Sequence, residues 1–160
     1  MEFILAWLEG SALGEFMRTG RWTYALFNLL HVFGIACLFG AIATLDLRLL
    51  GLWRHVPVAV LARPIVTVAG SGLALALATG ICLLATQGTE YVGNPFLTIK
   101  LVALAFGIIN VVALNFSSAW RGLELAEASK AGRTRLAVGG AISLLSWVTV
   151  ISAGRLIAYW

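Results

Sequence analysis

Residues Leu29–Leu52, LLHVFGIACLFGAIATLDLRLLGL, decide the fold of this chain. The stretch is apolar over more than the roughly 20 residues that a helix needs to cross a bilayer. One imidazole, His31, lies near its beginning, and Asp46 and Arg48 lie near its end. Because ionisable side chains are costly inside a membrane and usually serve a site, His31 is the first candidate for a functional residue.

The composition of the whole chain agrees with a membrane protein. Of its 160 residues, 61% are hydrophobic and only 11% are charged, whereas about a quarter of a globular domain is charged. We therefore expect a single transmembrane domain over residues 1–160, with the lipid bilayer as its surroundings. The net charge of +4 comes from scattered basic residues, which fit lipid headgroups and topology signals and not a nucleic-acid surface. Cys37 and Cys82 lie in separate apolar runs, so neither a structural disulfide nor a zinc motif is expected.

The hydropathy pattern predicts an all-α, integral membrane four-helix bundle with an N-terminal interfacial amphipathic segment. Residues 1–21 form this segment, with a break at Gly10-Ser11 and an anchor at Trp7; a frayed terminus is the alternative. The predicted spans are residues 22–50, 64–86, 96–118 and 136–159. The second span is expected to start at about Pro64. Asn94-Pro95 should start the helix of the third span, because proline suits the first position of a helix.

Small residues within the spans predict where helices pack closely. Gly72, Ala76 and Gly80 recur at four-residue intervals and should face another helix. Gly34 and Gly40 in the first span should also allow a neighbour to approach.

The distribution of basic residues predicts the orientation. The first and third connectors, residues 51–63 and 120–135, carry most of the arginines and lysines outside the spans: Arg54, Arg63, Arg121, Lys130, Arg133 and Arg135. The positive-inside rule then makes these connectors cytoplasmic and places both termini on the outer, periplasmic side.

The polar residues of three spans suggest a site. Tyr24, Asn28 and His31 share one face of the first span, Lys100 lies near the outer start of the third span, and Arg155 near the outer end of the fourth. We expect these groups to converge on one leaflet. A neutral imidazole with two cations nearby suits an anionic amphipathic ligand, such as a haem with its propionates, or a quinone headgroup.

Structural roles for the same residues stay open. Lys100 and Arg155 could extend to headgroups without a ligand. His31 could bond Asn28, Asn110 or a carbonyl of another helix, and Asn110 and Asn115 could serve as hydrogen bonds between helices. Asp46 and Arg48 are two positions apart and do not share a helical face, so each should pair across helices or with headgroups.

Three segments carry a resemblance to known families: residues 31–51 (HVFGIACLFGAIATLDLRLLG), 94–101 (NPFLTIKL) and 153–159 (AGRLIAY). They resemble an uncharacterised family of small bacterial four-helix membrane proteins, which implies a multi-pass protein of the bacterial inner membrane. His31, Arg48 and Lys100 are remotely similar to positions in the HemJ-type protoporphyrinogen oxidases and the CopD copper-resistance proteins. The HemJ-type resemblance implies a b-type haem with His31 as ligand and Lys100 as an important lysine, although the tryptophan that follows the HemJ-type histidine is absent here.

The number of histidines limits the kinds of haem site. A site with two axial imidazoles needs two histidines inside the bundle, but the chain has only His31 and His55, and His55 lies in a connector. A five-coordinate haem, a site completed by another protein, or a non-haem ligand therefore stay open. No Ser/His/Asp arrangement, glycine-rich phosphate loop or acidic pair supports hydrolysis or phosphoryl transfer, and a transporter would lack paired carboxylates.

We therefore expect a membrane redox protein that binds a lipophilic cofactor, with haem b as the first candidate, for electron transfer or oxidase chemistry; whether it is an enzyme stays open. The expected site comprises His31 as metal ligand with Tyr24, Asn28, Lys100 and Arg155. A quinone, a redox partner protein, further copies or the subunits of a complex are the expected partners. The alternatives are a cofactor-free accessory subunit of a larger complex, and copper handling through Cys37, His31, Met1 and Met17.

Overall fold

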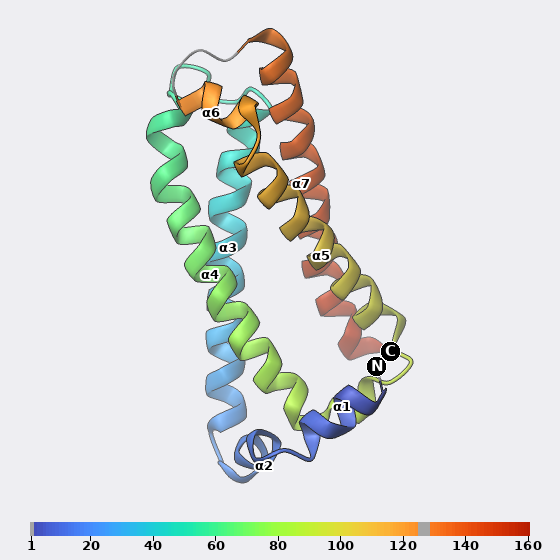
Figure 1. Ribbon diagram of the computed structural model, residues 1–160. Helices are drawn as coiled ribbons and strands as arrows, with labels where there is room; N and C mark the ends of the chain where they lie inside the picture. The colour runs from blue at the N-terminus through green and yellow to red at the C-terminus, as the bar shows by residue number, and fades with distance from the viewer. Residues whose placement is uncertain (1, 125–128) are drawn as a thin grey trace. The chain divides into compact units, whose positions relative to one another are not determined.

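The computed structural model describes residues 2–124 and 129–160, and every regular element within them is helical (Figure 1). Four helices are long and apolar enough to cross a membrane. They are α3 (Thr23–Leu49), α4 (Val58–Gln87), α5 (Pro95–Asn115) and α7 (Lys130–Leu156). The shorter elements are α1 (Glu2–Glu9), α2 (Ala12–Thr19), α6 (Ser118–Glu124) and the 3-10 turns η1 (Gly88–Tyr91) and η2 (Ile157–Tyr159). The predicted all-α fold with four membrane-length helices is thus confirmed. Met1 and residues 125–128 of the third connector lie outside the described residues.

Two compact units make up the fold. Unit 1 comprises Met1–Leu38 and Gly70–Asn94, and unit 2 comprises Phe39–Ala69 and Pro95–Trp160. Helices α3 and α4 therefore contribute to both units: the first part of α3 and the last part of α4 belong to unit 1.

In unit 1 the backbones of α3 and α4 approach each other through small residues. A Cβ atom added to Gly72 would lie 2.6 Å from the Leu38 nitrogen, one added to Gly34 would lie 2.8 Å from the Ala76 nitrogen, and one added to Gly80 would lie 3.1 Å from His31 Cε1. The prediction that Gly72, Ala76 and Gly80 face another helix is confirmed. Only the expectation for Gly40 is wrong, since among the described residues a Cβ atom there would meet nothing within 4 Å.

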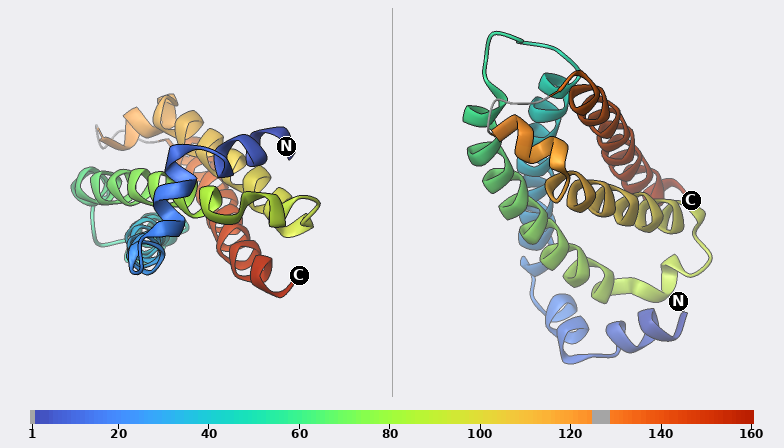
Figure 2. Two further views of the ribbon diagram at one scale, coloured as in Figure 1. Left: turned by 90° about the horizontal axis from the view of Figure 1, so that it is seen from below. Right: turned by 45° about the horizontal axis from the view of Figure 1, so that its top comes forward.

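The N-terminal segment forms two short helices and not a frayed end (Figure 2). They are separated at Gly10-Ser11 as predicted, and the Ser11 hydroxyl caps α2 by accepting a hydrogen bond from the Gly14 nitrogen at 3.3 Å. Arg18 of α2 donates hydrogen bonds to the Ala85 and Thr86 carbonyl oxygens at 3.4 and 3.2 Å. These carbonyls belong to the last turn of α4, where a cation is favoured by the helix dipole. Unit 1 therefore holds its N-terminal helices against the end of α4.

In unit 2, α5 and α7 run antiparallel and side by side (Figure 1). Glycines of both helices make room for large side chains of the other: Gly107 for Trp147, and Gly139 for Leu114. The Asn110 amide nitrogen donates a hydrogen bond to the Gly139 carbonyl oxygen at 3.0 Å. Asn110 therefore links two helices, as one interpretation of the sequence proposed.

An apolar cluster holds the connector end of unit 2 together. It joins the end of α3, the start of α4, α6 and the start of α7 through Leu45, Val58, Ala62, Ala119, Trp120 and Leu136. Helix α4 begins at Val58, directly after Pro57, so Pro64, at which the second span was predicted to start, lies inside the helix. Helix α7 begins at Lys130, before the predicted fourth span, and α5 begins at Pro95 as expected.

Candidate functional site

His31 links α3 to α4 within unit 1. Its half-buried imidazole has Nδ1 2.9 Å from the Ala76 carbonyl oxygen and 3.1 Å from the Thr79 hydroxyl oxygen. Among the partners considered from the sequence, the carbonyl of another helix is therefore correct, while Asn28 has an exposed side chain and Asn110 belongs to unit 2.

The two partners of Nδ1 determine which ring nitrogen carries the proton. A carbonyl oxygen only accepts hydrogen bonds, so Nδ1 must donate to Ala76. The Thr79 hydroxyl donates to the Leu75 carbonyl oxygen at 2.6 Å, which leaves its own oxygen to accept from His31. In its neutral form the imidazole therefore carries its proton on Nδ1 and its lone pair on Nε2.

The other predicted members of the site are divided between the units. Tyr24 and Asn28 lie on α3 in unit 1, and both side chains are exposed. Lys100 and Arg155 lie in unit 2. Their convergence with His31 stays a prediction.

Within unit 2, Lys100 and Arg155 occupy the same end of the α5–α7 pair. Lys100 packs on Gly154, where an added Cβ atom would lie 3.4 Å from Nζ and 3.6 Å from Cδ. The neighbouring Arg155 donates a hydrogen bond to the Tyr159 hydroxyl at 2.6 Å, and its guanidinium lies over the Tyr159 ring at 5.0 Å. Arg155 is therefore held by Tyr159, while in the described parts of the chain no hydrogen bond or ion pair involves Lys100 Nζ.

Asp46, which was expected to pair across helices or with headgroups, lies in a second polar site. Only 4% of the residue is exposed, and it faces α7 at Gly140 and Ser143. Within residues 2–124 and 129–160, Asp46 Oδ2, Ser143 Oγ and Trp147 Nε1 are buried without a hydrogen-bond partner of good geometry. The spacing of Ser143 and Trp147, one helical turn apart, was the only signal of this site in the sequence.

Unlike Asp46, Arg48 makes side-chain hydrogen bonds of good geometry. Its Nε donates to the Val56 carbonyl oxygen at 2.7 Å and its Nη2 to the Arg54 carbonyl oxygen at 3.2 Å. Both acceptors belong to the connector that follows α3, so Arg48 stabilises this connector. Pairing of Arg48 with another helix or with headgroups had been expected.

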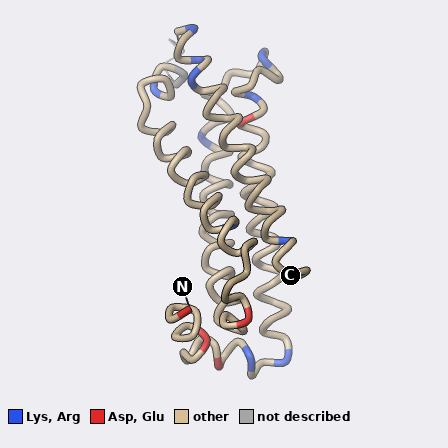
Figure 3. Tube along the Cα trace, turned by 90° about the vertical axis from the view of Figure 1, so that its right-hand side faces the viewer, with Lys and Arg blue, Asp and Glu red and all other residues tan. Residues whose placement is uncertain are grey.

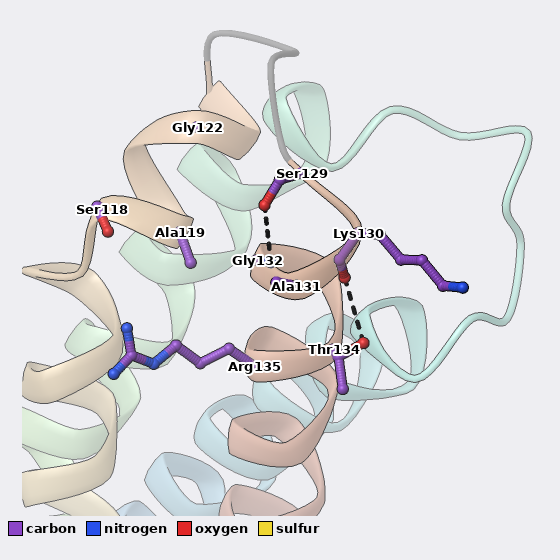
Figure 4. Close-up of a pocket in the computed structure, with 9 residues that line it drawn as sticks. All are labelled: Ser118, Ala119, Gly122, Ser129, Lys130, Ala131, Gly132, Thr134 and Arg135. Atoms are coloured by element: carbon purple, nitrogen blue, oxygen red, sulfur yellow. Dashed lines mark hydrogen bonds between the residues drawn. The ribbon is translucent and has the colours of Figure 1, made fainter.

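Two pockets lie at the connector end of unit 2, where lysines and arginines gather (Figure 3). The larger, of about 1010 Å³, is formed by residues of α6 and the start of α7 (Figure 4). The smaller, of about 490 Å³, has Arg48, Arg54, Lys130 and Arg133 in its wall. In Figure 4 the Lys130 side chain extends away from that of Arg135. The sequence showed these cations only as topology signals.

A metal cluster made by several protein ligands is not found. The part of the chain that the structure describes contains no group of three or more His, Cys, Asp or Glu residues able to hold a metal ion. Cys37 and Cys82 are free thiols in unit 1, as the sequence predicted.

The chain belongs to DUF6644, described as a family of unknown function, whose family model matches residues 4–160. The predicted membership of an uncharacterised family is therefore confirmed. No curated protein matches the chain, and no solved structure does. The function must accordingly be argued from the site itself.

Proposed function

We propose that this protein is a multi-pass redox protein of the bacterial inner membrane that binds a lipophilic cofactor, with haem b as the first candidate and His31 as the iron ligand. The proposal includes periplasmic termini and an electron-transfer or oxidase role. The observation that carries it is the hydrogen bond between His31 Nδ1 and the Ala76 carbonyl oxygen, at 2.9 Å.

This hydrogen bond supports ligation because of the tautomer that it selects. Histidines that bind metals commonly donate from their second ring nitrogen to a carbonyl or carboxylate, which fixes the ring and makes the ligating nitrogen more basic. His31 has this arrangement on Nδ1, with Thr79 as an additional acceptor at 3.1 Å. Nε2 is then the atom suited to bind iron.

The donor set fits one axial imidazole. His55 lies exposed in the connector after α3 and belongs to unit 2. A bound haem would supply the redox-active iron and two propionates. In the proposal Lys100 and Arg155 neutralise these carboxylates, and Tyr24 and Asn28 line the cofactor beside His31.

A cofactor-free accessory subunit is the second candidate, and the same contacts favour it. The bond from His31 to Ala76 also links α3 to α4 as structural hydrogen bonds in membranes do, beside the close contacts of Gly34 and Gly72. In this candidate the imidazole stabilises the helix pair and binds nothing else.

An absorption spectrum separates the two candidates. The full-length protein, purified from haem-replete cells and reduced with dithionite, should show a Soret band and haem b bands. His31→Ala should abolish or sharply reduce the Soret band, while His55→Ala should retain it. Colourless wild-type protein would overturn the haem proposal and favour the accessory subunit.

A further inference from the structure

We propose that the smaller pocket of unit 2 binds the phosphate of an anionic phospholipid headgroup through Arg48, Arg54, Lys130 and Arg133. This inference does not depend on the proposed redox function. The pocket, of about 490 Å³, lies at the end of α3, along the following connector and at the start of α7.

The positive charge of the pocket wall favours the binding of an anion. Four basic residues line one cavity, and no carboxylate is present among its described lining residues. Like charges gathered around a small volume repel each other, and this repulsion is relieved when an anion occupies the centre. A phosphate group is the anion that arginine recognises best, because its oxygens accept several parallel N–H bonds.

Arg48 of α3 and Arg54 of the following connector are held in place before any ligand binds. Arg48 donates to the Val56 and Arg54 carbonyl oxygens, and Arg54 Nε donates to the Gly51 carbonyl oxygen at 3.1 Å. The turn that presents these carbonyls has positive φ angles of 110° at Gly51 and 49° at Trp53. These bonds leave most guanidinium N–H groups available for a ligand. Preorganised donors lose less entropy on binding, which strengthens recognition.

The position of the pocket along the chain points to a lipid as the source of the phosphate. The pocket lies where two membrane-length helices end or begin, α3 at Leu49 and α7 at Lys130. Phosphates of the bilayer lie at this depth, and basic pockets between membrane helices bind such headgroups. The wall also contains Leu49, Leu50, Val58 and Leu136, which provide apolar contact for the glycerol and the first acyl carbons.

Lipid binding by the full-length protein tests the proposal. Delipidated protein in a neutral detergent is titrated with phosphatidylglycerol or phosphatidylcholine of the same acyl chains and followed by native mass spectrometry. Wild type should bind phosphatidylglycerol at least about tenfold more tightly, the effect of one charge-assisted hydrogen bond. The Arg54→Gln, Lys130→Gln double variant should lose this preference.

A matched double variant controls for charge. Arg63→Gln with Arg121→Gln removes the same charge from exposed positions outside the pocket and should keep the preference. Lys130→Gln alone guards against misfolding, because no side-chain bond joins Lys130 to another described residue, and it should weaken phosphatidylglycerol binding without changing thermal unfolding in detergent.

Three results would overturn the proposal. Both lipids carry a phosphate, so equal binding of the two by wild type would reject a pocket selective for an anionic headgroup. An equal loss in both double variants would show diffuse surface charge instead of a pocket. Displacement of phosphatidylglycerol by inorganic phosphate at a comparable concentration would make a soluble phosphate the ligand and reject the lipid.

Discussion

Gly34 and Gly72 bring the backbones of α3 and α4 into contact within unit 1. A Cβ atom added to Gly72 would lie 2.8 Å from the Gly34 carbonyl oxygen, and one added to Gly34 would lie 3.0 Å from the Gly72 carbonyl oxygen. Such a pair of contacts leaves no room for a side chain at either position, because both obstructing atoms are backbone. This close approach is what allows His31, on the same helix pair, to reach the Ala76 carbonyl oxygen.

The first prediction tests this helix contact. Gly72→Leu should separate the two helices and cost about 1–3 kcal/mol, as overpacking does. Gly70→Ala is the control, since a Cβ atom there would meet no described atom within 4 Å, and it should be neutral or slightly stabilising. The measurement is thermal unfolding in detergent. Equal stability of the Gly72 variant and wild type would show that the helices do not touch at this position.

The second prediction concerns the imidazole. Nitrogen-15 NMR of histidine-labelled protein without cofactor should show the His31 proton on Nδ1, because the Ala76 carbonyl oxygen accepts from this atom. Thr79→Val should keep this tautomer and cost about 0.6 kcal/mol, the average for a hydrogen bond between membrane helices. Thr79→Ser, which keeps the hydroxyl, is its control. A proton on Nε2 would remove the argument for iron ligation through that atom.

Regular features of the fold were predictable because they have local signals. Long apolar runs predicted the four membrane-length helices, Gly10-Ser11 predicted the break between α1 and α2, and Pro95 predicted the start of α5. Pro64, where the second span was predicted to start, does not mark the start of the helix, because α4 already begins at Val58, directly after Pro57.

The contacts of the candidate sites were less predictable for physical reasons. The acceptor of His31 is a backbone carbonyl oxygen. Every residue has such an oxygen, so the sequence does not identify Ala76 as the partner. The partners of Arg18 are likewise backbone carbonyls at the end of a distant helix. The surroundings of Asp46 depend on which face of α7 meets it, and a helix that is apolar all round does not reveal this.

The third prediction concerns the attachment of α2. Arg18→Met keeps much of the apolar stem of the side chain but removes its bonds to the Glu9, Ala85 and Thr86 carbonyl oxygens. Because Arg18 is exposed, the loss should be on the order of 1 kcal/mol, below that of buried charged hydrogen bonds. Limited proteolysis should then cleave the N-terminal segment faster. Arg21→Met, which removes an exposed cation beside Trp22, should leave the cleavage rate unchanged; equal acceleration would contradict the role of Arg18.

The fourth prediction is a pH dependence at α1. The nitrogen and the hydroxyl of Thr89 both donate to Glu9 Oε2 at 2.7 Å, and these bonds, assisted by the charge of Arg18, hold the pKa of Glu9 below its ordinary value of 4.5. A lowered pKa means that the attachment of α1 to η1 is fully stabilised above the ordinary value and weakens as the pH falls through the folded pKa.

Hydrogen exchange at the Thr89 amide measures this effect. In wild type, the protection factor, corrected for the intrinsic exchange rate, should fall as the pH is lowered from 6 through the ordinary carboxyl range. Glu9→Gln should give weaker protection at pH 6 and no such decline. The same decline in both proteins would assign the pH dependence to another group.

The last prediction concerns the unpartnered polar atoms around Asp46. Ser143 Oγ and Trp147 Nε1 are buried without a hydrogen bond of good geometry in the described residues, although Ser143 lies against the Asp46 carboxyl, so their removal should cost little. Ser143→Ala and Trp147→Phe should each change the free energy of unfolding by less than about 0.5 kcal/mol, after allowance for the smaller ring, because a buried polar group without a partner is itself unfavourable.

Asn110→Leu provides the contrast, because the Asn110 amide donates a hydrogen bond to the Gly139 carbonyl oxygen. This substitution should lower the free energy of unfolding by about 0.6 kcal/mol or more. Thermal unfolding of the three variants under one set of detergent conditions gives the comparison. Leaving a buried polar group without its hydrogen bond costs about 1–3 kcal/mol. If Ser143→Ala lowers the free energy of unfolding by about 2 kcal/mol or more, the Ser143 hydroxyl has a bound water or ligand as its partner. Asp46 would then belong to an occupied polar site inside the membrane, where ionisable residues commonly mark function.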